Sequence, residues 1–262
     1  MRNIDDFSQR FRNRELLVGT FVKTPDPVVF EVLARSLLDF VVLDAEHAPF
    51  DRRDINDCVL AATAGGLPVL VRVPNSDPVW IQQALDVAAQ GVVVPHVRSP
   101  QEAASIVRSA HFGNNGRGYA GSTRAADYTR RSMASHIELS ARSTVVVAQV
   151  EDAEAIPHAH AIASTDGLDG LFIGPVDLSI SMGAPSPNAP EVLTAMRAVA
   201  SASESAGKCS GIFISSADDL DRYEGMNLRF LLVRSEQSFM MTSADLSCTE
   251  IRSHSSWSEN VN

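Results

Sequence analysis

Short apolar runs alternate with amphipathic segments along nearly the whole chain, and this alternation constrains the fold more than any other feature. Runs of this kind are typical of strands buried on both faces of a parallel sheet. Eight of them are followed by a helical pattern, which is the count of a (β/α)₈ barrel, whereas a doubly wound open sheet uses fewer strands. We therefore predict an α/β fold, a TIM barrel, with strands at 16–23, 39–47, 68–73, 91–97, 143–151, 170–174, 210–214 and 230–233.

The length of 262 residues fits one such domain, because barrels of this class reach this size undivided. We place the barrel at 1–252, with a short amphipathic helix at its N-terminus. The serine-rich residues 253–262 are predicted to be a disordered tail. Residues 113–135, rich in Gly, Arg and Ser, are too long for a routine connection, and we expect them to fold over the barrel mouth.

Composition excludes several classes of partner. A net charge of -10 argues against nucleic acid and against anionic membranes, since both require a basic face. No apolar run is long enough to cross a bilayer. Three cysteines without a pairing motif suit a reducing compartment, and the N-terminus lacks a signal-peptide pattern. We expect a cytoplasmic protein that acts on a small molecule.

Polar side chains gather where the predicted strands end. In a barrel of this class the active site lies at the carboxyl ends of the strands. The second strand begins as the apolar run Val41-Val42-Leu43 and ends abruptly in two carboxylates and a histidine. The residues predicted to converge at that end of the barrel are Asp44, His47, Arg72, Glu151 and Asp177.

Two of these residues, Glu151 and Asp177, come from neighbouring strands and suit one hard cation such as Mg²⁺ or Mn²⁺. The alternative is that Asp177 caps a helix and Glu151 is a charge on the rim. His47 suits a general base whose tautomer Asp44 fixes, or else a hydrogen-bonded rim residue. Arg72 ends an apolar strand and must meet a carboxylate, either of the protein or of a substrate.

Two further residues have weaker claims. Asp86 lies on the third predicted helix, where a polar contact to a neighbouring loop or subunit is the simpler interpretation. Lys23 ends the first strand and is the only candidate for an imine-forming lysine, because Lys208 precedes its strand and lies at the wrong end of the barrel.

Four ordered motifs resemble the HpcH/HpaI aldolase family. They are Asp44-Ala45-Glu46-His47-Ala48-Pro49, Val71-Arg72-Val73-Pro74, Gln149-Val150-Glu151 and Gly174-Pro175-Val176-Asp177-Leu178-Ser179. The resemblance runs over residues 18–233, and residues 117–124 resemble the long loop of the macrophomate synthase-like subgroup.

The resemblance implies a metal-dependent (class II) pyruvate aldolase, a carbon–carbon lyase. Such an enzyme cleaves a 2-oxo-4-hydroxy acid into pyruvate, or an analogue such as hydroxypyruvate, and an aldehyde through a metal-bound enolate. It also implies a hexamer of dimers that exchange their last helix, and a cofactor ion of Mg²⁺, Mn²⁺ or Co²⁺. The implied roles are metal binding by Glu151 and Asp177, base catalysis by His47 with Asp44, substrate binding by Arg72, Gln149, Gly174 and Pro175, and support from Asp86 across a subunit boundary.

The chain departs from the family pattern at the end of the eighth strand, where Arg234 replaces a small residue. This arginine either binds an acidic acceptor aldehyde or forms a structural ion pair with Glu236, and the ion pair is the commoner fate. Two other functions stay open. A hydroxyacyl-CoA lyase requires a basic approach for phosphates, yet the chain has only two lysines. A catalytically silent barrel would keep the fold alone.

Overall fold

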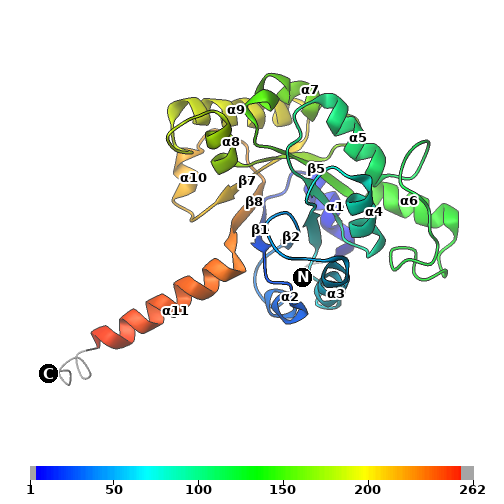
Figure 1. The fold of residues 1–262 in the computed structure, drawn as a ribbon, viewed down its shortest axis with the longest axis horizontal. Helices are drawn as coiled ribbons and strands as arrows, with labels where there is room; N and C mark the ends of the chain where they lie inside the picture. Colours follow the sequence, from blue (N-terminus) through cyan, green and yellow to red (C-terminus); the bar gives the residue numbers. More distant parts are fainter. Residues whose placement is uncertain (1–3, 255–262) are drawn as a thin grey trace.

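Eight parallel strands form a closed barrel in the computed structural model, which describes residues 4–254 (Figure 1). Each strand pairs with the next along the chain, and the eighth pairs with the first. The predicted (β/α)₈ fold with a short N-terminal helix is confirmed. The strands are β1 (Leu17–Val22), β2 (Phe40–Asp44), β3 (Val69–Arg72), β4 (Gly91–Val94), β5 (Val145–Val150), β6 (Gly170–Ile173), β7 (Cys209–Ile214) and β8 (Phe230–Ser235).

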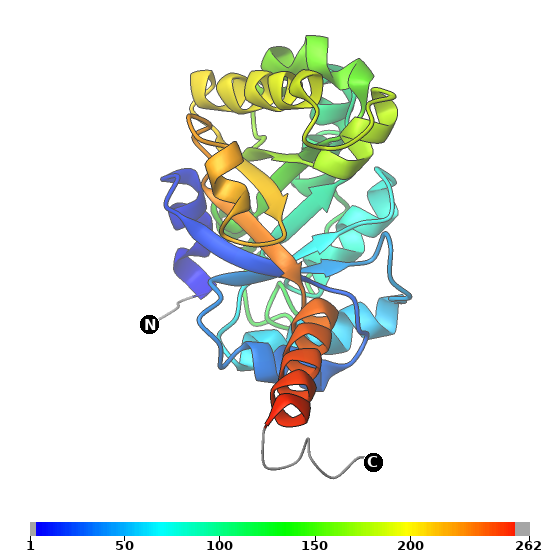
Figure 2. The ribbon, with the colours of Figure 1, turned by 90° about the vertical axis from the view of Figure 1, so that its left-hand side faces the viewer.

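Helices follow the strands and cover the outside of the barrel (Figures 1 and 2). Most begin at a side-chain cap or a proline, as Asp51 and Ser99 illustrate. Among residues 4–254, no helix combines the length and the apolar character needed to cross a bilayer. The helices are η1 (Ile4–Asp6), α1 (Phe7–Arg12), α2 (Pro27–Leu33), α3 (Arg52–Ala64), α4 (Pro78–Asp86), α5 (Pro100–Ala110), α6 (Met133–Ser143), η2 (Ala153–His158), α7 (Ala159–Ala163), α8 (Pro175–Ser181), α9 (Pro190–Ser205), α10 (Asp219–Arg222) and α11 (Glu236–Ser253).

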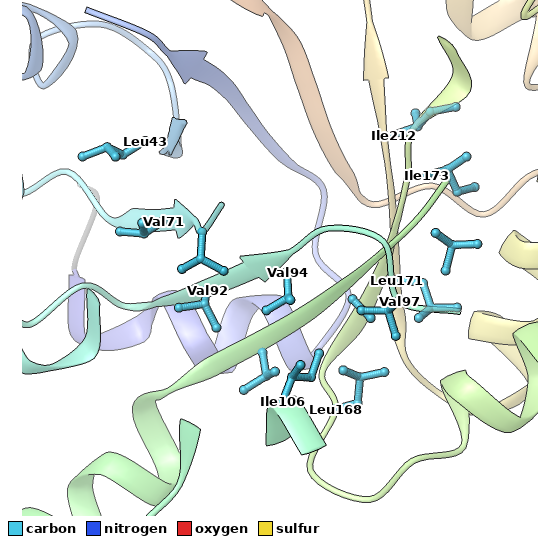
Figure 3. Close-up of a cluster of buried hydrophobic side chains, with 14 of the residues drawn as sticks. Leu43, Val71, Val92, Val94, Val97, Ile106, Leu168, Leu171, Ile173 and Ile212 are labelled. Atoms are coloured by element: carbon cyan, nitrogen blue, oxygen red, sulfur yellow. The ribbon is translucent and has the colours of Figure 1, made fainter. Parts of the chain in front are cut away.

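The strands are apolar on both faces because each face meets a separate core. Outward-facing residues such as Leu43, Val71 and Ile173 pack against the helices (Figure 3). Inward-facing residues such as Val42 and Leu70 fill the barrel itself. Burial on both sides leaves only the strand ends free to carry polar chemistry.

The short N-terminal helix closes the bottom of the barrel with two phenylalanines. Phe7 lies 5.6 Å from the ring of Phe40, and Phe11 lies 5.2 Å from that of Phe230. All four rings are fully buried, so they plug the barrel at the amino ends of the strands.

The glycine-, arginine- and serine-rich residues 113–135 do not lie over the barrel mouth, so this prediction from the sequence is wrong. The segment follows α5 and precedes β5, so it joins a helix to a strand and lies at the amino ends of the strands. Arg124 donates there to the carbonyls of Asn56 and Val87. The predicted loop runs directly into α6, a helix that was not predicted from the sequence. Ser132 caps the first turn of this helix.

The last helix, α11, projects away from the barrel instead of folding back along it (Figures 1 and 2). Only its first residue, Glu236, is buried. The predicted disordered tail falls mostly on residues 255–262, which lie outside the described residues, while Ser253 is the last residue of α11.

Candidate active site

A pocket of about 380 Å³ opens at the carboxyl ends of the strands. Its walls come from β1, β3, β5, β6, β7 and β8 and from the segments that follow β2, β6 and β8. Strand curvature in a closed barrel brings these distant parts of the chain to one point. The lining residues are Phe21, Lys23, His47, Arg72, Gln149, Phe172, Gly174, Pro175, Val176, Asp177, Phe213, Arg234, Ser235, Gln237 and Ser238.

A buried ion pair joins Asp44 to Arg72 at the base of this pocket. The two residues are direct partners in the β2–β3 register. Arg72 donates from Nε to Oδ1 at 2.9 Å and from Nη2 to Oδ2 at 2.7 Å, and Asp44 is fully buried. Burial opposes ionisation, but the hydrogen bonds and charge of Arg72 outweigh it and lower the pKa of Asp44. Arg72 thus meets a protein carboxylate, with its remaining Nη1 free of that pair.

The expected pairing of Asp44 with the imidazole of His47 is not found. Asp44 Oδ1 accepts the backbone N–H of His47 at 3.2 Å, and Arg72 donates to both carboxylate oxygens. The imidazole lines the pocket with 55% of the side chain exposed, and its Nε2 lies 3.7 Å from Oε2 of Glu46. Asp44 therefore orients His47 through the backbone turn, not through the ring.

The buried carboxylate of Glu151, the largely buried carboxylate of Glu46 and the half-exposed imidazole of His96 form a compact cluster beside the pocket. One ligand atom from each of Glu46, His96 and Glu151 lies within 4.8 Å of the others. Burial, together with the charges of Glu151 and Asp44, raises the pKa of Glu46 to about 7 against the opposing charge of Arg72. Burial also raises the pKa of Glu151. Like charges held out of water in this way favour either a proton or a cation between them.

Glu46 has the least satisfied side chain of the cluster. Its Oε2 atom is buried and has no hydrogen-bond partner. Arg72 Nε is 3.3 Å away, within range of a charge interaction, but it directs its hydrogen bond to Asp44. A buried acceptor without a donor is expensive, and a divalent ion is one way to satisfy it. The donor set therefore fits the divalent ion that the sequence predicted.

The other predicted metal ligand, Asp177, lies in the first turn of α8 and lines the pocket. It stands outside the three-residue cluster, but its charge contributes to the raised pKa of Glu151, after the larger effect of burial. The backbone of Gly174 packs closely against the Glu151 carboxylate, because a Cβ at this position would lie 2.9 Å from Oε2. Gln149, fully buried, donates its amide to the same carboxylate oxygen.

Arg234 reaches the pocket but does not pair with Glu236. Its Nε donates to the carbonyl of Ser215 at 2.6 Å, and it adopts a left-handed backbone with φ 53°. Glu236 instead accepts the backbone N–H groups of Lys23 and Thr24 and closes the seam between β8 and β1. The predicted ion pair between Arg234 and Glu236 is therefore wrong. Glu236 is buried at the start of α11 and does not pair with Arg234.

Asp86 is the last residue of α4 and is not among the residues that line the pocket. Its Oδ1 is 3.7 Å from Nη2 of Arg117. A contact to a neighbouring loop was the simpler interpretation of the sequence. Its support of a site in a neighbouring subunit stays a prediction. Lys23 Nζ lies 3.4 Å from Asp44 Oδ2 and is thus engaged in an ion pair at the pocket wall.

Glu46 and His96 received no role from the sequence. Glu46 stands within the motif after β2, and His96 lies two residues past Val94, the last residue of β4. The position of each just past a strand end was the available signal. The sequence alone could not show that Glu46 and His96 meet Glu151, because the three residues follow three different strands.

Comparison with known proteins agrees with this geometry. The family model described as HpcH/HpaI aldolase/citrate lyase matches residues 17–231. A hydroxypyruvate/pyruvate aldolase of Pseudomonas aeruginosa is 34% identical, over 92% of this chain and 90% of its own length. A solved HpcH/HpaI aldolase/citrate lyase family protein from Burkholderia cenocepacia J2315 superposes with a TM-score of 0.89 at 32% identity, over 95% of this chain and all of the other. The structure of macrophomate synthase superposes with a TM-score of 0.84 at 25% identity, over 99% and 92%.

Proposed function

Because the chain belongs to the HpcH/HpaI aldolase/citrate lyase family, we propose that it is a metal-dependent aldolase, a carbon–carbon lyase. It interconverts a 2-oxo-4-hydroxy acid with an aldehyde and pyruvate, or a close analogue such as hydroxypyruvate. The observation that carries the proposal is the convergence of Arg72, His47 and Gln149 on one pocket beside buried carboxylates. Chemistry of this kind needs a cationic donor, a proton carrier and a site for a divalent ion.

Glu151 and Asp177 would hold the ion, which is Mg²⁺, Mn²⁺ or Co²⁺ in this proposal. When bound, the ion supplies Lewis-acid polarisation of the keto and carboxylate oxygens of the acid. Gln149 keeps the Glu151 carboxylate in place through its amide. Beyond Gly174 and Pro175, the first N–H groups of α8 lack helical partners and are available to the substrate carboxylate.

Arg72 and His47 divide the remaining work. Asp44 holds Nε and Nη2 of Arg72, so Nη1 is left to donate to the keto oxygen as negative charge develops there. The His47 imidazole accepts the proton of the 4-hydroxyl group while the C3–C4 bond breaks and the aldehyde leaves. The electron pair of that bond forms the enolate, and return of the proton to C3 gives the keto acid.

A screen for pyruvate release tests this function. Protein freed of metal by a chelator is incubated with a panel of 2-oxo-4-hydroxy acids, with and without added Mg²⁺, Mn²⁺ or Co²⁺. We expect release only with added metal, and loss of that release in Glu151→Gln, which removes a charged ligand while keeping the shape of the side chain. Full activity in the chelated protein, or cleavage of hydroxyacyl-CoA thioesters alone, would contradict the proposal.

We also propose that the last helix packs against a second copy of the chain, within a hexamer. In a (β/α)₈ barrel the helix after β8 normally covers the outside of the barrel next to β1. Here α11 points away, with Met240, Met241, Leu246 and Ile251 all more than half exposed. Several exposed apolar side chains on a helix that projects from its own domain are typical of an interface.

Light scattering on purified protein tests this assembly. Charge introduced by Met241→Asp with Ile251→Asp is expected to reduce the molar mass to that of a smaller species, because burying two carboxylates in an apolar interface is unfavourable. The matched control, Thr249→Asp with Ser253→Asp, changes exposed polar positions on another face of the same helix and is expected to keep the wild-type mass. A wild-type protein that is monomeric would contradict the proposal.

A further inference from the structure

His96 occupies an unusual backbone position at the end of β4. It has φ 55°, a left-handed conformation that is uncommon outside glycine, although asparagine, aspartate and histidine adopt it more often than other residues. In this conformation its backbone N–H donates to Oε1 of Glu151 at 3.0 Å, and its ring extends toward the same carboxylate. Rare conformations of this kind persist where the surroundings hold them, and they cluster at functional sites.

The ring of His96 is oriented by a second carboxylate. Nδ1 lies 3.0 Å from Oδ2 of Asp152, and Arg98 Nε lies 3.1 Å from the same oxygen. In the neutral tautomer with its proton on Nδ1, that nitrogen donates to Asp152 and the lone pair lies on Nε2. A histidine held by a carboxylate on one nitrogen is the common arrangement of metal-binding histidines.

Both ring nitrogens lie beside carboxylates of the cluster: Nδ1 is 3.4 Å from Oε1 of Glu151, and Nε2 faces Glu46. Nε2 is 3.8 Å from Oε1 of Glu46, whose side chain is 91% buried and whose Oε2 has no hydrogen-bond partner. The ligand atoms of Glu46, His96 and Glu151 lie within 4.8 Å of one another. Ligands around an ion held at about 2.1 Å are about 3–4 Å apart, so small side-chain movements bring all three to one ion.

We infer that His96 is a nitrogen ligand of the divalent ion, which Glu46 and Glu151 bind with it. The inference rests on the proposed function, because it concerns the same ion. Glu151 belongs both to this cluster and to the pair with Asp177, so a single ion can meet ligands from both sides. An imidazole in a carboxylate site favours Co²⁺, Ni²⁺ and Zn²⁺ over Mg²⁺.

Replacing His96 by asparagine separates the ring from the backbone. Asparagine tolerates the left-handed conformation, so His96→Asn keeps the turn and removes the imidazole. Calorimetry is expected to find Co²⁺ binding weakened about 10- to 100-fold and Mg²⁺ binding changed less than about threefold. His158→Asn, at an exposed position of η2, is the control and is expected to match the wild type.

Pulsed electron paramagnetic resonance of bound Mn²⁺ gives a readout that does not depend on affinity. We expect the wild type to show coupling to a histidine nitrogen that is absent from His96→Asn and retained in His47→Asn. His96→Gly, which also permits a positive φ, is expected to behave like His96→Asn and guards against a folding defect.

The outcomes distinguish this inference from the proposed function. Wild-type protein that binds Mn²⁺ without nitrogen coupling, or coupling that survives in His96→Asn, overturns the ligand assignment and leaves the aldolase proposal standing. Equal loss of Mg²⁺ and Co²⁺ binding in His96→Asn also overturns it, because a merely structural role would weaken both ions alike. Wild-type protein that binds no divalent ion overturns both.

Discussion

His47→Asn is expected to lower kcat by about 10²–10⁴-fold, the usual contribution of a general base. Pyruvate affinity, measured as product inhibition, is expected to change less than about threefold. The reason for this split is that the imidazole lines the pocket, whereas the charged contacts of the site come from Arg72. Steady-state kinetics at saturating metal measures both quantities.

His160→Asn, at an exposed position of α7, is the matched control and is expected to retain wild-type kinetics. If His47→Asn retained wild-type kcat, the imidazole would not be the proton carrier. Equal losses in kcat and in pyruvate affinity would instead indicate that His47 binds substrate.

Arg72→Met is expected to destabilise the fold by about 3–5 kcal/mol, because it leaves the fully buried Asp44 carboxylate without its main partner. Lys23, 3.4 Å away and one-third exposed, compensates only in part. Urea unfolding measures the loss. Arg53→Met, which breaks an exposed pair with Asp57 on α3, is the control and is expected to cost about 0.3–0.5 kcal/mol.

Activity and stability separate in the double variant Arg72→Met with Asp44→Leu. Removing both charges is expected to recover most of the lost stability, since no unpaired charge stays buried. Turnover is expected to stay low, because Nη1 of Arg72 is still missing from the pocket. Recovered turnover in the double variant would show that Arg72 acts only as a structural partner of Asp44.

The same ion pair predicts how stability depends on pH. The folded pKa of Asp44 is depressed, so its contribution is fully present above the ordinary pKa of an aspartate, about 3.9. That contribution is lost as the pH falls through the lower folded value. The Arg72→Met variant is therefore expected to show a weaker acid destabilisation than the wild type.

Local pattern was sufficient to predict the barrel. Continuous apolar runs identified all eight strands. His47, Arg72 and Asp177 line one pocket, whereas Asp44 is buried against Arg72 and Glu151 belongs to the neighbouring cluster. This success has a physical cause: in a closed parallel barrel, position along the strand alone determines which end a side chain reaches. Asp44 and Arg72 became partners because their strands are neighbours in register.

Partnerships across the barrel could not be predicted in the same way. Glu236 was expected beside Arg234, two residues away, but it binds backbone N–H groups of Lys23 and Thr24, more than 200 residues away in the sequence. The choice of hydrogen-bond partners for Glu236 depends on the shifted register where β8 pairs with β1. The local sequence pattern also does not determine the direction of α11, which projects away from the barrel (Figure 1).

His96 illustrates a third limit. Its place after β4 was visible in the sequence, yet its importance comes from a left-handed backbone and from carboxylates on two other strands. A β-branched or aliphatic residue there would have fitted the strand pattern equally well. Backbone conformations of this kind are set by the surrounding fold rather than by the residue itself.

Exchange of the methyl protons of pyruvate in deuterated water, followed by NMR, tests the central claim most directly, because it detects formation of the enolate without any aldehyde. We predict rapid loss of the methyl signal with metal-loaded protein, none with chelated protein, and no pyruvate adduct on Lys23 after borohydride treatment. Exchange that persists in the chelated protein, together with a borohydride-trapped adduct on Lys23, would contradict the account.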